Sequence, residues 1–146
     1  MRFKKFFFVL SFFTVLFLIG ISKNFFSFSF FSKNKNAQHF YFTSDADGAR
    51  YAGMFFLASE DVINDKNSVL GEMIVLAKGE TTLGEIKHFF NAHVVGEEKV
   101  EDLQIFYLHT SLLKKSIETE EKVFNLQVIF SKEDVKICYP INFGGF

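Results

Sequence analysis

A long apolar run near the amino end constrains this chain more than any other feature. Phe6–Ile21 contains no charged residue, and Arg2, Lys4 and Lys5 stand directly before it. A basic start followed by an apolar run is typical of a segment that addresses a chain to a membrane. As a helix the run would extend about 24 Å, slightly less than the ~30 Å of hydrocarbon in a bilayer. We therefore expect membrane contact through residues 6–26, with the flanking aromatic side chains included.

Two fates of this segment remain open from the sequence. It can stay as a single-pass signal anchor, with a cytoplasmic amino end and an exported domain, because the basic residues precede it. It can also be a signal peptide cleaved near Ser22, because Gly20 and Ser22 supply small residues with the required spacing, and this would release a secreted or periplasmic domain. The triplet Leu18-Ile19-Gly20 is similar to the start of a bacterial lipobox. Ile21 follows it instead of cysteine, so a lipoprotein is excluded.

Composition divides the chain into three parts. We expect a membrane segment over residues 1–31, a polar linker over residues 32–38 and one domain over residues 39–146. Residues 1–37 carry six basic side chains and no acidic one, whereas residues 38–146 carry ten basic and seventeen acidic side chains. An acidic domain argues against nucleic acid and anionic lipid as direct ligands, and it favours a protein partner with a basic surface. We expect the domain itself to be monomeric.

Alternating apolar residues near the carboxyl end predict an antiparallel hairpin. In the strand expected over Val123–Phe130, even-numbered residues from Phe124 share one face, and Asn125 and Gln127 share the other with Ile129. A turn over residues 131–134 leads to a second strand that starts at Val135. Keeping most apolar residues on one face predicts these opposed pairs: Phe130 with Val135, Val128 with Ile137, Leu126 with Tyr139, and Gln127 with Cys138.

The rest of the domain reads as strands with one clear helix. We expect strands at His39–Thr43, Val69–Ala77 and Leu103–His109, and Ala49–Ser59 fits a strand better than the alternative helix. Thr82 and Glu85 have the spacing of a capping box, which predicts a helix over Leu83–Ala92 with Leu83, Ile86 and Phe90 on its apolar face. We expect a loop over Glu60–Ser68, and a charged connection with a helical turn over Ser111–Lys122. The predicted fold class is α+β, a small antiparallel sheet with one or two helices packed on one face.

Residues with catalytic or metal-binding chemistry are few and scattered. His88 and His93 are five residues apart, which on one helix would place them on different faces, whereas helical zinc sites use spacings of three or four. His39 and His109 fall on expected strands without a nucleophile motif beside them. Cys138 is the only cysteine, so the chain has no internal disulfide. Asp45 and Asp47 precede Gly48, but the positions that would complete a calcium loop hold Thr43 and Met54.

No catalytic, cofactor or metal site is therefore predicted from the sequence. The favoured hypothesis is a non-enzymatic, membrane-anchored, extracytoplasmic protein-binding domain, such as an envelope accessory protein or an immunity-type inhibitor. The alternative is a small exported hydrolase or isomerase, whose site assembles only in the fold. A cleft with His39 or His109 beside an acid or beside Cys138 would favour this alternative, whereas a flat acidic surface would favour the first.

Overall fold

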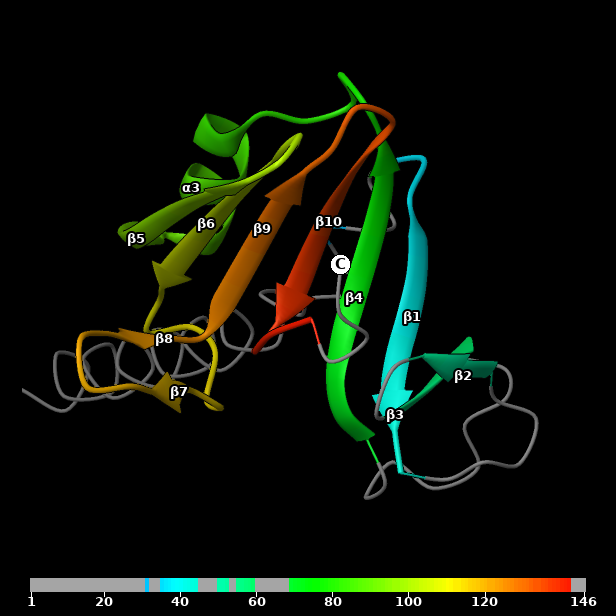
Figure 1. Ribbon diagram of the computed structural model, residues 1–146, viewed down its shortest axis with the longest axis horizontal. Helices are drawn as coiled ribbons and strands as arrows, with labels where there is room; N and C mark the ends of the chain where they lie inside the picture. The colour runs from blue at the N-terminus through cyan, green and yellow to red at the C-terminus, as the bar shows by residue number, and fades with distance from the viewer. Residues whose placement is uncertain (1–30, 32–34, 45–49, 53–54, 60–68, 143–146) are drawn as a thin grey trace, which may run out of the picture.

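The fold is dominated by one large antiparallel sheet with a single helix against it. The computed structural model describes residues 31, 35–44, 50–52, 55–59 and 69–142. Eight strands form the main sheet in the order β2-β3-β1-β4-β10-β9-β6-β5, and β7 and β8 form a separate two-stranded ribbon (Figure 1). The elements are β1 (Gln38–Thr43), β2 (Arg50–Ala52), β3 (Phe55–Ser59), β4 (Val69–Ala77), α3 (Leu83–Phe90), β5 (His93–Val100), β6 (Leu103–His109), β7 (Ile117–Glu118), β8 (Val123–Phe124), β9 (Leu126–Phe130) and β10 (Asp134–Tyr139).

Most sequence predictions of strands are confirmed, and so is the hairpin register. The strand expected at Val69–Ala77 coincides with β4, and the segment expected to be a strand or a helix contains the strands β2 and β3. In the β9–β10 hairpin, Val135 lies opposite Phe130 and Ile137 opposite Val128. The antiparallel sheet with one helix therefore supports the α+β class for the described part of the chain.

Helix α3 begins where the capping box predicts. Thr82 Oγ1 accepts from the Glu85 backbone N–H at 3.2 Å, and the Glu85 carboxylate accepts from the Thr82 N–H at 3.0 Å. The helix ends at Phe90, two residues before the predicted end, because Asn91 adopts a left-handed conformation with φ 46°. A residue in this conformation terminates a helix and reverses the chain. The reversal lets His93 start strand β5.

The helix buries one face of the sheet. Ile86 and Phe90, one helical turn apart, are buried against the sheet residues Ile74, Val128 and Ile137. We call this side the helix face. Phe31, only 3% exposed, also belongs to this core, with its ring centroid 4.9 Å from that of Phe89 and 5.5 Å from that of Phe90. The core therefore reaches a residue that lies before the expected linker.

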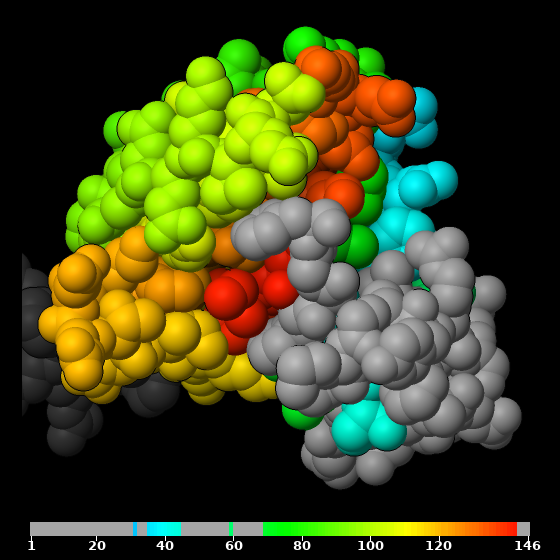
Figure 2. All heavy atoms as spheres, viewed as in Figure 1, coloured from blue at the N-terminus to red at the C-terminus, as the bar shows by residue number. Residues whose placement is uncertain are grey.

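The opposite face of the sheet is also buried. The sequence predicts helices on one face and no cover for the other. We call it the hairpin face, because Ile117 of β7 and Phe124 of β8 pack there with Ile105, Ile129 and Cys138. Figure 1 views the molecule from this side, with α3 behind the strands, and in Figure 2 the β7–β8 ribbon lies within the yellow and orange atoms on the face toward the viewer. Two apolar cores thus sandwich the central strands.

Two predictions near this ribbon are wrong. The helical turn expected between Ser111 and Lys122 is a short strand, β7, paired with β8. The strand expected over Val123–Phe130 is interrupted at Asn125, which divides it into β8 and β9. Asn125 and Gln127 are both only 1% exposed. The Asn125 amide bonds to the backbone of Thr110, and the Gln127 amide oxygen accepts from the Asn142 N–H. Regular strand pairing is interrupted at Asn125, where the side chain makes these bonds.

The apolar run Phe6–Ile21 lies outside the described residues. Within those residues, no helix combines the length and apolarity that a bilayer span requires. The membrane segment therefore stays a prediction from the sequence.

Candidate functional site

Strand β5 forms one edge of the main sheet and is largely exposed. It pairs with β6 on one side, and none of the described residues pairs with its outer side. Six of its eight residues are exposed, among them Val94 and Val100 at 37% and 44%. A strand with an open edge offers unpaired N–H and C=O groups to another extended chain. This edge is the part of the described structure most suited to binding a second polypeptide.

The turn after β5 identifies which backbone groups face outward. Val100 lies opposite Leu103 across the two-residue turn Glu101-Asp102, and Glu101 has a left-handed φ of 53°. Such two-residue turns close on a hydrogen-bonded pair, and pairs then alternate along the ladder. Counted from Val100, the backbone groups of Lys99 and Glu97 point away from β6. These two residues present the open donors and acceptors of the edge.

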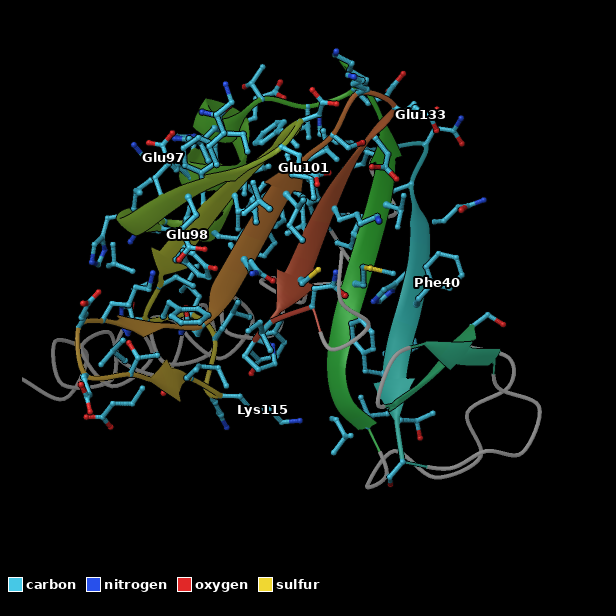
Figure 3. The ribbon with its side chains drawn as sticks, in the orientation of Figure 1. Phe40, Glu97, Glu98, Glu101, Lys115 and Glu133 are labelled. Atoms are coloured by element: carbon cyan, nitrogen blue, oxygen red, sulfur yellow. The ribbon has the colours of Figure 1, made fainter. Side chains whose placement is uncertain are left out.

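Acidic side chains surround this edge. Glu97 accepts from Gln104 Nε2 at 2.9 Å, while Asp102 pairs with Lys132 at 2.6 Å. Glu101 makes no side-chain hydrogen bond or ion pair among the described residues and stands at the tip of the hairpin (Figure 3). Because all of these groups are exposed, their fields reach an approaching chain and are screened by salt. We define Glu97, Glu98, Glu101 and Asp102 as the acidic edge.

Glu98, on the hairpin face, ties the acidic edge to the β7–β8 ribbon. Its carboxylate accepts from the Tyr107 hydroxyl at 3.1 Å and lies 3.5 Å from Lys122 Nζ. Lys122 Nζ in turn lies 3.8 Å from the centre of the Tyr107 ring, in a cation–π contact. Burial, followed by the hydrogen bond and negative charge of Glu98, raises the pKa of Tyr107. Gly96 permits this packing, because a Cβ there would approach Lys122 to 3.1 Å.

The structure places one histidine beside an acid. His39 Nε2 lies 3.1 Å from Glu72 Oε2, and the Tyr41 ring centroid lies 4.6 Å from that of His39. The three residues come from the adjacent strands β1 and β4, where Tyr41 is directly opposite Glu72. A carboxylate that holds one imidazole nitrogen can orient the other for proton transfer. This is the arrangement on which the enzyme alternative depends.

Cys138 does not join that pair. It belongs to the hairpin face, whereas His39 lies opposite Ile74, a residue of the helix face. The cysteine is fully buried, and this burial raises the pKa of its thiol far above the ordinary range. A buried neutral thiol is a poor nucleophile. As predicted, Cys138 lies opposite Gln127 in the sheet.

The remaining histidines are arranged differently from the sequence prediction. His88 is exposed in the last turn of α3, but His93 lies on β5, so the comparison of helical faces does not apply to this pair. Instead, His93 lies directly opposite His109 on β6. Within the described residues, no group of three or more His, Cys, Asp or Glu side chains is arranged to hold a metal ion. Asp45 and Asp47 lie outside the described residues.

Neither strand β5 nor the acidic edge as a structural unit is predicted from the sequence. Val94 and Val95 are adjacent in sequence, and so are Glu97 and Glu98, which hides the period of two expected for a strand. A register shift between Val94 and Gly96 explains the broken pattern, since a bulge inserts one extra residue. The β-branched pair next to a glycine was the only available signal.

No family model, curated protein or solved structure matches this chain.

Proposed function

We propose that this chain is a non-enzymatic, membrane-anchored, extracytoplasmic module that binds a protein partner through the acidic edge. The observation that supports this most directly is the open side of β5, with outward backbone groups at Glu97 and Lys99. Addition of a strand to such an edge supplies affinity through main-chain hydrogen bonds and specificity through side chains. The bound element of the partner is therefore an extended segment.

Charge selects the kind of segment. Two of the four carboxylates of the acidic edge already have cationic neighbours, Glu98 with Lys122 and Asp102 with Lys132. Glu97 and Glu101 have no ion pair among the described residues, so Lys and Arg residues on an incoming strand meet opposite charge there. Pairing of two β5 strands from separate copies, centred on Glu97, would place that glutamate opposite its own counterpart, and like charges directly opposite each other oppose this register. The partner is accordingly a basic segment of a different protein, as the acidic balance of residues 38–146 suggests.

The location of the partner follows from the predicted anchor. A membrane segment over residues 6–26, with its basic residues retained in the cytoplasm, would export the domain. The partner would then be an envelope protein, or an exported protein that reaches the same compartment. Added protease should digest the domain in spheroplasts, and protection until lysis would contradict this orientation.

The binding mode is tested with the full chain in detergent micelles and a labelled peptide that alternates Lys and Thr. Fluorescence anisotropy gives the dissociation constant. Lys99→Pro removes the outward N–H and should weaken binding at least about tenfold, the equivalent of ~1.4 kcal/mol. Lys99→Gln is the matched control, since it removes the same charge but keeps the N–H. It should bind as tightly as the parent chain, or more tightly.

Charge is tested separately on the same peptide. Reversal of Glu97 and Glu101 to Lys should weaken binding and reduce its dependence on salt, because exposed complementary charges mainly raise the association rate. Reversal of Glu80 and Glu133, both exposed and outside the acidic edge, makes the same change in net charge and should have a smaller effect. Equal losses in the two reversed pairs, or no loss with Lys99→Pro, would refute binding at this edge.

A second candidate function, a small exported hydrolase or isomerase, is favoured by the His39–Glu72 pair alone. Its side chains are 10% and 23% exposed, which leaves limited access to a reacting molecule. His39→Gln and Glu72→Gln should each abolish turnover of a panel of esters and peptides without changing the circular dichroism spectrum. If the parent chain hydrolyses none of the panel, hydrolysis of these substrates is excluded.

A further inference from the structure

The pairing of β5 with β6 brings two histidines together that are far apart in sequence. His93 lies directly opposite His109, and their ring centroids are 5.6 Å apart with 52° between the ring planes. From this geometry, and independently of the protein-binding role, we propose that His93 and His109 form a two-ligand site for a late first-row divalent metal ion such as Cu²⁺ or Zn²⁺.

The ring separation agrees with coordination of one ion by both imidazoles. A zinc ion binds an imidazole nitrogen at about 2.0–2.1 Å, which places the ring centroid roughly 3.2 Å from the metal. Two centroids 5.6 Å apart then enclose an angle of about 120° at the ion, near the ~109° of tetrahedral coordination. Coordination then requires that one nitrogen of each ring point toward the ion between them.

The two rings are also available to a ligand. His93 is exposed and His109 is half-buried, and neither makes a side-chain hydrogen bond or ion pair within the described part of the chain. His39, in contrast, already contacts Glu72 through Nε2. Because adjacent strands fix the backbones of His93 and His109, the site needs little ordering of the chain when the metal binds. This preorganisation lowers the entropic cost of chelation.

Chemistry decides which ions the site accepts. Imidazole suits copper, nickel and zinc, whereas magnesium and calcium prefer oxygen ligands, and affinity rises toward Cu²⁺ in the first-row series. No third acidic, histidine or cysteine ligand joins the pair among the described residues, so we assign the remaining positions to water. The site is therefore open, and it should bind Cu²⁺ more tightly than Zn²⁺.

The test uses the full chain in detergent micelles, titrated with Cu²⁺ and, in a separate experiment, with Zn²⁺ by calorimetry. The parent chain should bind one equivalent at this site. His93→Ala and His109→Ala should each weaken binding by at least the 10–100-fold typical of losing an outer-shell partner, since each removes a direct ligand. His88→Ala is the matched control, because His88 is exposed on α3 and lies outside the pair. It should leave the affinity unchanged.

Electron paramagnetic resonance of the Cu²⁺ form gives a readout that does not depend on affinity. The parent spectrum should show coupling to two imidazole nitrogens, and either alanine variant should show one fewer. Circular dichroism verifies that the variants remain folded, and His93→Gln provides a second variant that preserves a polar side chain. The proposal is overturned if His88→Ala weakens binding as much as the other variants, or if both alanine variants retain the parent affinity and spectrum.

Discussion

Replacement of Asn125 by alanine should destabilise the fold more than any surface substitution. Asn125 is 1% exposed and satisfies three backbone groups at once. Its Nδ2 donates to the carbonyl oxygens of Thr110 at 2.7 Å and Leu113 at 3.0 Å, while its Oδ1 accepts from the Thr110 N–H at 2.9 Å. The side chain thus joins the β8–β9 junction to the segment that follows β6.

The expected loss of stability follows from the three backbone groups that Asn125 satisfies. A buried group left without a hydrogen-bond partner costs about 1–3 kcal/mol. The two Thr110 groups lie in buried bonds, whereas the Leu113 bond is partly buried and water can replace it. Asn125→Ala should therefore lower the free energy of unfolding by about 3–5 kcal/mol, a large share of the ~5–15 kcal/mol typical of a domain.

Urea denaturation of the full chain, followed by far-ultraviolet circular dichroism, measures this loss. Gln104→Ala is the control, because it removes an exposed hydrogen bond to Glu97 and should cost about 0.5 kcal/mol or less. Asn125→Asp should not restore stability, since it replaces two donated bonds with a buried charge. A cost below ~1 kcal/mol for Asn125→Ala would refute the assignment of this amide as the structural centre of the junction.

Three further substitutions test the cap of α3, the packing at Gly96 and the burial of Cys138. Thr82→Ala removes the cap of α3 and should cost ~1 kcal/mol in urea denaturation, whereas Thr82→Ser should cost clearly less. Gly96→Ala crowds Lys122 and should loosen the β7–β8 ribbon, so faster amide exchange at residues 117–124 is expected; unchanged exchange would contradict the contact. Burial keeps Cys138 protonated in the fold, so stability should fall as pH rises above the ordinary thiol pKa of ~8.5, where only the unfolded thiol ionises. Cys138→Ala should reduce this alkaline loss, and equal losses in both chains would contradict the prediction.

Local sequence signals predicted the parts of the fold that depend on neighbouring residues. Thr82 and Glu85 placed the start of α3, because a capping box is complete within four residues. The alternation through Val128 and Ile137 gave the register of the β9–β10 hairpin, since a shift by one residue would reverse the buried face. In these cases the chemistry that decides the structure is present in one short segment.

Contacts between residues far apart in the chain could not be predicted from local sequence patterns. Asn125 carries no sign in the sequence that its amide serves the backbone of Thr110, fifteen positions away. The His93–His109 pair requires the register of β5 and β6, and the bulge in β5 conceals that strand. The acidic balance was visible in composition, but its concentration along an open edge becomes apparent only when β5 is placed at the end of the sheet.

Amide hydrogen exchange of the full chain tests the central proposal most directly. It is measured residue by residue on the backbone of β5, with and without the basic Lys–Thr peptide at saturating concentration. In the absence of the peptide, the outward N–H groups of Glu97 and Lys99 should exchange rapidly. With the peptide bound they should become protected, because the added strand accepts hydrogen bonds from them. Binding that leaves both amides unprotected would contradict strand addition at the acidic edge.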